Sequence, residues 1–451
     1  MERLRFLLAL WISKLAAAVI PLLAPGRGTN FPGVLALRID PDFLRHFRGA
    51  SPERTVFVTG TNGKSTAVAL LYRALTQAGY RVISNLDGAN MTSGVAVPLL
   101  RSSSLTGQLT CDYLVMETDE RYVARIGTQL PAGYLCVTNI QKDQVQRNGE
   151  PGVILNKLRE AVSPDLTLIL NHDEPNCFSL SRAQAAAVVT YGVEPGERSS
   201  RSASDFFSVG MPCPVCHHAI SFDACNITNV GPFHCPGCGL GADSVPDYPA
   251  HDVSFAEHRF CCQDHTYSFH YSAPQFLYSY LLALAAARTL GVPEEAIAAA
   301  FDAFRSESHR IMDARAGCHR LHYHKMKQEN SETLQDTVNF IAGDSQEKLL
   351  LLALDEYIDF NPPYLNTCFL FDCDFKRLKT SGLSQWACTG RYAAPSAAIR
   401  LAYDGFDPAA GTLLPSSDEK ELAAYLDKAD CDNSYLVEEI PCWQRKEHGL
   451  K

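Results

Sequence analysis

The stretch Thr59-Gly60-Thr61-Asn62-Gly63-Lys64-Ser65-Thr66 follows an apolar, strand-forming run at 55–58 and precedes a helix-forming run at 67–75. Strand, glycine turn and helix in this order are typical of a phosphate-binding loop. The glycines let backbone N–H groups turn towards an anion at the positive end of the helix. Lys64 would reach the terminal phosphates, and the Ser65 hydroxyl would ligate the accompanying Mg²⁺. A plain glycine turn would leave Lys-Ser-Thr unexplained, so the stretch predicts a nucleotide site, although only two residues separate its glycines.

Length and charge narrow the class of protein. A chain of 451 residues is long enough for two or three domains. Its formal net charge of −10 provides no overall basic field, so we do not expect a nucleic acid partner. Its 16 cysteines are scattered through a long chain rather than packed into a small secreted scaffold. Together with a nucleotide site, they indicate reduced thiols and a cytoplasmic protein.

Residues 6–24 are almost entirely apolar, with Lys14 the one charge. Three interpretations remain open: a signal anchor, a transmembrane span, and a helix that packs on the protein or lies on a membrane surface. A nucleotide-dependent body downstream argues against export, and Lys14 would be costly at a bilayer centre. The packed or interfacial helix is therefore favoured.

After the phosphate loop, strand-like runs alternate with helical runs, which predicts an α/β fold with a parallel sheet covered by helices. The run 113–116 ends in Glu117-Thr118-Asp119-Glu120. Carboxylates at a strand end beside a phosphate loop can hold Mg²⁺, whereas the alternative is a solvated acidic loop. The other expected strands are 81–84, 134–137, 166–170 and 187–191.

Two C-x-x-C pairs lie about twenty residues apart and offer four thiolates for tetrahedral Zn²⁺. Four thiolates leave no open coordination position, so the expected site is structural. A redox dithiol would need one pair only and is the minor alternative. Nearby Cys225, His217, His218 and His234 are expected to be loop residues. The expected zinc ligands are Cys213, Cys216, Cys235 and Cys238.

Helical patterns at 275–290 and 294–304 close this region, and a domain boundary is expected near residue 314. Beyond it, 348–354 and 367–371 are predicted strands ending at Asp355 and Asp372, and 394–403 is a predicted helix. This alternation predicts a second, smaller α/β domain.

The loop sequence G-T-N-G-K-S-T resembles that of the Mur ligases and their folylpolyglutamate synthetase relatives. Further segments resemble the MurT subunits of lipid II isoglutaminyl synthase, in the same order along nearly the whole chain: 26–33, 85–90, 117–120, 138–150, 170–175 and 400–405. The resemblance implies an N-terminal segment (1–47), a Mur-ligase central ATP-binding domain (48–314) with a zinc ribbon inserted at about 205–265, and a Rossmann-like C-terminal α/β domain (315–451).

The resemblance also implies a reaction. ATP would phosphorylate the D-glutamate α-carboxylate of lipid II, and ammonia from a GatD-type glutaminase partner would convert the acyl phosphate to D-isoglutamine. The enzyme would be a cytoplasmic heterodimer, and the apolar segment 6–24 leaves peripheral contact with the inner face of the membrane open. The implied residues are Gly60, Thr61, Asn62, Gly63, Lys64, Ser65, Thr66 and Arg310 for the nucleotide, Ser65 and Glu117 for magnesium, and Lys64, Glu117, Asp355 and Asn366 for catalysis.

The chain departs from the family pattern at Leu281, Met312, Asn366 and the stretch 325–331. Asn366 stands where the resemblance implies an acid that orients the partner's histidine; an amide can accept that hydrogen bond but cannot neutralise an imidazolium. Two alternatives to the ligase therefore remain: a catalytically degenerate ATP- and zinc-binding scaffold of a cell-wall complex, and a ligase of the same chemistry that acts on another acid.

Overall fold

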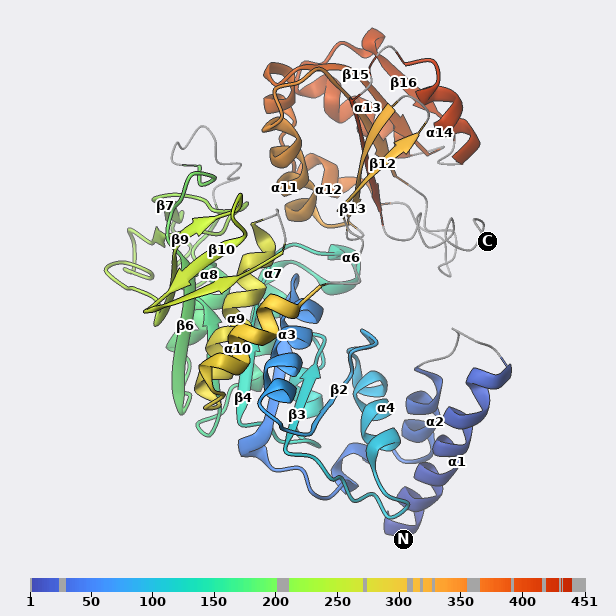
Figure 1. The fold of residues 1–451 in the computed structure, drawn as a ribbon, viewed down its shortest axis with the longest axis vertical. Coiled ribbons are helices and arrows are strands. Elements are labelled where there is room, and N and C mark those ends of the chain that lie inside the picture. Colours follow the sequence, from blue (N-terminus) through green and yellow to red (C-terminus); the bar gives the residue numbers. More distant parts are fainter. Residues whose placement is uncertain are drawn as a thin grey trace. The chain divides into compact units, whose positions relative to one another are not determined.

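The computed structural model describes residues 2–23, 30–200, 211–270, 274–305, 311–316, 319–326, 329–354, 366–390, 393–415, 419–429, 431 and 433–439. The chain forms two compact units. The first comprises 1–141, 150–205 and 210–305, and the second comprises 142–149, 206–209 and 306–451. Each unit has its own sheet (Figure 1), with a hydrophobic core on either face of that sheet.

The first unit is built on a nine-stranded sheet in the order β11-β10-β9-β6-β5-β4-β1-β3-β2. From β2 to β9 the neighbouring strands are parallel, and β9, β10 and β11 continue the sheet as antiparallel strands. The strands are β1 (Thr55–Thr59), β2 (Val82–Ser84), β3 (Tyr113–Glu117), β4 (Tyr134–Val137), β5 (Thr167–Asn171), β6 (Ala187–Val193), β9 (Tyr248–Ser254), β10 (Arg259–Cys262) and β11 (His265–Ser268).

Strand β1 lies inside this sheet and is buried on both faces, which is why its sequence is a continuous apolar run. Side chains alternate along a strand, so Val56 and Val58 enter the core on one face and Phe57 enters the core on the other. Parallel pairing with β3 and β4 places the carboxyl ends of three strands at one edge. That edge is where ligands gather on such sheets.

Helices cover both faces of the sheet (Figure 1). Helices α3 (Lys64–Gln77), α9 (Gln275–Thr289) and α10 (Glu294–Ala303) contribute to the core that contains Val56 and Val58. Helices α4 (Thr92–Ser102), α5 (Val123–Gly127) and α7 (Pro151–Ala161) contribute to the core that contains Phe57. The short helix α8 (Pro175–Phe178) follows β5 in the chain, whereas α6 (Val145–Asn148), which follows β4, belongs to the second unit.

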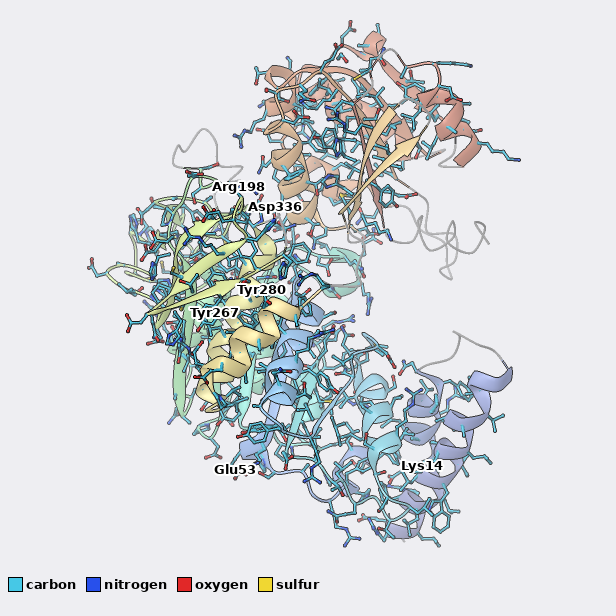
Figure 2. The ribbon with its side chains drawn as sticks, viewed as in Figure 1. Lys14, Glu53, Arg198, Tyr267, Tyr280 and Asp336 are labelled. Carbon is cyan, nitrogen blue, oxygen red and sulfur yellow. The ribbon has the colours of Figure 1, made fainter. Side chains whose placement is uncertain are left out.

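The N-terminal apolar run forms α1 (Glu2–Leu23), which packs beside α2 (Phe31–Ile39) and α4. Phe6, Ala9 and Leu10 are buried in the same core as Phe57. Lys14, labelled in Figure 2, donates a 2.7 Å hydrogen bond to the Ser103 carbonyl. Among the described helices, none combines the length and apolar character that crossing a bilayer would require. The packed helix is thus the interpretation that the structure supports.

The second unit has a six-stranded sheet in the order β12-β13-β17-β14-β15-β16, in which β12 and β13 are antiparallel and the remaining pairs are parallel. Helices α11 (Ser331–Ala342) and α13 (Ala393–Tyr403) contribute to one core of this unit, and α14 (Glu419–Leu426) contributes to the other. The strands are β12 (Ile311–Ala316), β13 (His319–Met326), β14 (Lys348–Ala353), β15 (Leu383–Thr389), β16 (Gly411–Leu414) and β17 (Asn433–Glu439).

One predicted strand in this unit is wrong. Residues 367–371 were expected to be extended, whereas 368–371 form the short helix α12 (Cys368–Phe371). An apolar run of only five residues shows no periodicity that separates a strand from a buried helical turn. Within this segment Phe369 and Leu370 enter the core, whereas Phe371 is exposed.

Candidate functional site

The phosphate-loop residues occupy the turn between β1 and α3 at the carboxyl edge of the sheet. Gly60 has φ of 119° and Gly63 has φ of 84°, which are left-handed values that side chains disfavour. A Cβ atom at Gly60 would lie 2.3 Å from the Thr138 hydroxyl oxygen. Both glycines are therefore required by the backbone path. The first N–H groups of α3 have no intrahelical acceptor, so this end of the helix suits an anion.

The segment after β4 holds the loop in place. The Thr61 amide donates a 2.8 Å hydrogen bond to the Asn139 carbonyl, and the Asn62 amide donates a 2.9 Å hydrogen bond to Asn139 Oδ1. The Gln141 amide donates to Thr61 Oγ1 at 2.9 Å, and Asn62 Nδ2 donates to Gln141 Oε1 at 3.0 Å. The loop conformation is thus fixed by the neighbouring strand's end as well as by its own glycines.

The buried carboxyl group of Glu174 stabilises the segment after β4. Glu174 precedes α8 and accepts hydrogen bonds from the amides of Ile140, Asn176 and Cys177 at 2.8–3.0 Å. Complete burial raises the pKa of Glu174 to about 7, against the hydrogen bonds that lower it. Asn176 Nδ2 donates to the Ile140 carbonyl at 2.9 Å. Glu174 therefore links β5 to the segment that grips the phosphate loop.

Lys64 lies over the loop rather than in solvent. Its ammonium group contacts the Gly60 carbonyl and lies 3.3 Å from both the Thr61 carbonyl and Glu120 Oε2. Lys64 and Glu120 are both buried. A phosphate bound at the loop would lie close to this ammonium group. Lys64 would then contact phosphate oxygens in place of Glu120.

Glu117 ends β3 next to the loop. In the strand register Glu117 pairs with Val58, which is the residue before the end of β1 at Thr59. Its Oε1 accepts a 3.0 Å hydrogen bond from Asn90 Nδ2, and its backbone is clasped by Asn85 through two 2.8 Å hydrogen bonds. Ser65, in the first turn of α3, is exposed. Hydroxyl and carboxylate oxygens are ligands that Mg²⁺ accepts, so these residues fit the metal of a nucleotide complex.

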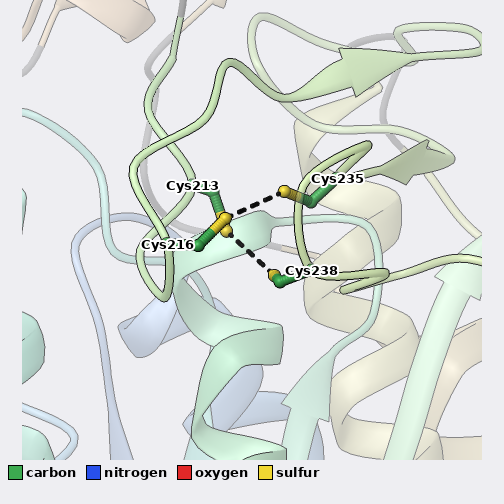
Figure 3. Close-up of side chains that lie close together, drawn as sticks. All are labelled: Cys213, Cys216, Cys235 and Cys238. Atoms are coloured by element: carbon green, nitrogen blue, oxygen red, sulfur yellow. Dashed lines mark hydrogen bonds between the residues drawn. The ribbon is translucent and has the colours of Figure 1, made fainter.

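The four cysteines of the two C-x-x-C pairs converge, as Figure 3 shows. All four sulfur atoms lie within 4.8 Å of one another. The sulfurs of Cys213 and Cys238 are 3.6 Å apart, and those of Cys216 and Cys235 are 3.4 Å apart. Tetrahedral zinc with bonds of about 2.3 Å requires sulfurs about 3.8 Å apart, so the cluster fits that ion. Cys225 and the three nearby histidines lie outside the cluster.

Two similar turns carry these cysteines. The Cys213 amide donates to the His218 carbonyl at 2.7 Å, and the Cys235 amide donates to the Leu240 carbonyl at 2.8 Å. The two-stranded sheet of β7 (Ser221–Phe222) and β8 (Phe233–His234) follows the first turn and leads into the second. The cluster has a small core of its own: Cys213, Ile220, Phe233, Cys235 and Leu240. A core of five residues is too small to hold such an insert without help, which is the setting in which a structural ion contributes to folding.

The second unit places Asn366 inside a hydrogen-bond network. Asn366 is buried, its Nδ2 donates to Glu329 Oε2 at 3.0 Å, and its Oδ1 accepts from the Cys368 amide at 3.0 Å. Both polar ends of this side chain are thus engaged within the chain. Two other expected site residues, Asp355 and Arg310, lie outside the described residues.

Several residues at this site were not singled out from the sequence. Glu120, which pairs with Lys64, was visible only as one of three clustered acids. Asn139 and Gln141 hold the loop, and Glu174 supports them. From the sequence these residues were visible only as parts of the family-like segments 138–150 and 170–175. Tyr278 is buried and donates a 2.7 Å hydrogen bond to Asp173 Oδ2. These are tertiary contacts between distant segments, for which a single sequence carries no direct signal.

Comparison with known proteins agrees with this geometry. The family model of the Mur ligase middle domain matches residues 58–235, which include the phosphate loop, Glu117 and three of the four clustered cysteines. The α/β fold of the chain is therefore Mur-ligase-like. The relatives that match most of its length include MurT subunits of glutamine-hydrolysing lipid II isoglutaminyl synthase, which confirms the resemblance carried by the motifs.

The MurT subunit of Streptococcus pneumoniae is 26% identical over 422 residues, covering 91% of this chain and 90% of that protein. The MurT subunit of Staphylococcus aureus is 25% identical over 381 residues, covering 81% and 80%. Among solved structures, a pseudomurein peptide ligase type C from Methanothermus fervidus superposes with a TM-score of 0.66 at 17% identity, covering 88% and 79%. MurF from Thermotoga maritima, solved with ADP, gives 0.56 at 13% identity, covering 93% and 85%. These structures show the shared fold.

Proposed function

We propose that this protein is the ATP-dependent amide-ligase subunit of a lipid II isoglutaminyl synthase. The observation that carries the proposal is the phosphate loop between β1 and α3, with Lys64 and Glu117 beside it, in a chain whose relatives over most of its length are MurT subunits. The substrate would be the D-glutamate α-carboxylate of lipid II, activated as an acyl phosphate and then attacked by ammonia.

The chain's own residues would act by position and charge. The loop amides and Lys64 would hold the phosphates, while Ser65 and Glu117 would hold Mg²⁺, which supplies charge neutralisation to phosphoryl transfer when bound. Glu120 holds Lys64 over the loop until phosphate arrives. Asn139, Gln141 and Glu174 keep the loop in a conformation ready for the nucleotide, which reduces the entropic cost of binding.

The cysteine cluster has a structural role in this proposal. Cys213, Cys216, Cys235 and Cys238 would bind zinc with all four positions filled by thiolates. Such a site holds two turns together and offers no position for a substrate. The ribbon would therefore stabilise the first unit without entering the chemistry.

Ammonia would come from a glutaminase partner, because the MurT relatives are subunits of glutamine-hydrolysing synthases, and the resemblance implies that this partner is of the GatD type. One observation favours a second candidate, a nucleotide-binding scaffold without ligase activity. Asn366 replaces the acid implied for the partner's histidine, and its side chain is engaged by Glu329 and Cys368. An assembly could thus form while the glutaminase remained without its orienting acid.

Reconstitution separates the two candidates. The purified chain is mixed with a GatD-type glutaminase, lipid II, glutamine and Mg-ATP, and amidated lipid II is measured by mass spectrometry. The ligase proposal expects ATP-dependent amidation, and free ammonium should replace the glutaminase and glutamine. ATP that remains intact with ammonium and lipid II, although it binds, would favour the scaffold.

A further inference from the structure

Helix α1 carries an exposed apolar stripe on the side away from the core. Leu15 is exposed to 67% and Leu4 to 62%. The intervals of three and four residues place these side chains along one line of the helix, which is about 22 Å long from first to last. We call this feature the α1 stripe, and it consists of Leu4, Leu8, Trp11, Ile12, Leu15 and Val19.

Polar contacts fix the helix with this stripe facing outward. Arg5 pairs with buried Asp40 at 2.9 Å, Lys14 donates to the Ser103 carbonyl, and Trp11 Nε1 donates to the Leu105 carbonyl at 2.8 Å. Phe6 and Leu10 occupy the core on the opposite side. The stripe is therefore held in place on a rigid support, and its exposure does not come from a loosely attached helix. A contiguous apolar surface of this kind marks an interaction site.

The segment that carries the stripe has a charge of opposite sign to that of the whole chain. Residues 1–50 contain seven Lys and Arg against three Asp and Glu, in a chain with a formal net charge of −10. Arg38, on α2, and Arg45 and Arg48, in the segment that follows α2, are exposed. An exposed apolar helix face within a basic segment is the combination that binds anionic lipid surfaces.

We propose that the α1 stripe docks this protein onto an anionic membrane surface. The stripe would enter the boundary between headgroups and acyl chains while the helix remained packed on the protein. A second copy of the chain is a poorer occupant, because two basic segments would then face each other. The inference does not depend on the proposed ligase activity, because it is argued only from the α1 stripe and from the charges of residues 1–50.

Vesicle flotation with the full chain tests the proposal. Phosphatidylcholine vesicles, with and without phosphatidylglycerol, are compared in the absence of nucleotide. The protein should float with the anionic vesicles and less with the neutral ones. The double variant Leu8→Gln, Leu15→Gln should bind anionic vesicles at least about tenfold more weakly, because two apolar side chains are lost from the contact. A matched variant, Ile399→Gln, Leu413→Gln, changes exposed apolar residues of the second unit and should bind as the parent does.

A second variant removes charge instead of apolar surface. Arg38→Gln, Arg45→Gln, Arg48→Gln should lose the preference for anionic vesicles while leaving the stripe intact. No flotation of the parent chain with either vesicle, or equal flotation of the parent and the stripe variant, would overturn the proposal. So would a dimer of the parent that the stripe variant converts to a monomer in light scattering. Nucleotide affinity, measured separately on the same variants, should be unchanged.

Discussion

Asn366 Nδ2 donates a 3.0 Å hydrogen bond to Glu329 Oε2, and both residues are buried. The resemblance to MurT subunits implies an acid at position 366, whereas here the carboxylate belongs to position 329 and the amide to position 366. An amide and a carboxylate form a stable buried pair, but two carboxylates at this distance would repel each other.

Restoring the implied acid alone should therefore destabilise the second unit. We expect Asn366→Asp to lose about 1–3 kcal/mol of unfolding free energy near neutral pH, through the lost hydrogen bond and the like charges. The double variant Glu329→Gln, Asn366→Asp exchanges the two groups and should recover most of that loss. Chemical denaturation of the parent and both variants measures the unfolding free energy. If the single variant is as stable as the parent, the pair does not act as described.

Lys64 should be needed for nucleotide binding and should also contribute to stability. Lys64→Met leaves the buried Glu120 carboxylate without its ion pair, which costs on the order of 3 kcal/mol in buried pairs. Adding Glu120→Gln should return the thermal midpoint towards that of the parent but should not return ATP affinity. If the double variant bound ATP as the parent does, Lys64 would have no contact with phosphate.

Zinc should hold the cysteine insert together. Cys213→Ser removes one of four ligands, and we expect loss of bound zinc with a decrease in stability on the order of 3 kcal/mol. The control is Cys368→Ser, which changes an exposed cysteine outside the cluster and should keep both zinc and stability. Metal content by mass spectrometry and thermal unfolding report the two quantities. A fully stable Cys213→Ser protein without metal would contradict the zinc assignment.

The buried Glu174 should make stability depend on pH. Burial raises its pKa from 4.5 to about 7, so the folded chain retains a proton there that the unfolded chain releases. The contribution of Glu174 to stability should therefore fall as pH rises from about 4.5 to about 7 and stay constant above that range. Glu174→Gln should remove this slope, whereas Glu160→Gln, on the exposed side of α7, should leave it unchanged. An identical slope in the parent and in Glu174→Gln would show that Glu174 does not titrate in this range.

The central elements of the fold could be predicted from sequence because most of their residues are buried. The expected strand 134–137 is observed as Tyr134–Val137, and the expected helix 275–290 is observed as Gln275–Thr289. A parallel strand buried on both faces must be apolar throughout, and glycine or proline marks its end. The prediction of a strand at 367–371 was wrong because this run is too short to show a periodicity.

The site was predictable where chemistry depends on local order and unpredictable where it depends on distant pairs. The loop Gly60–Thr66 and the two C-x-x-C turns are local, and the structure shows their glycine conformations and the convergence of the sulfurs. The Lys64–Glu120 and Asn366–Glu329 contacts join residues 56 and 37 positions apart. Their formation depends on how strands and helices pack, which spacing along the chain does not reveal.

The most direct test of the account is a calorimetric titration of the purified chain with ATP, with and without Mg²⁺. If the loop between β1 and α3, with Lys64, Ser65 and Glu117, is a nucleotide site, the chain should bind ATP at one site, more tightly with Mg²⁺. Lys64→Met, Glu120→Gln should abolish that binding in a folded protein. Absence of magnesium-dependent ATP binding by the folded parent chain would contradict the ligase proposal.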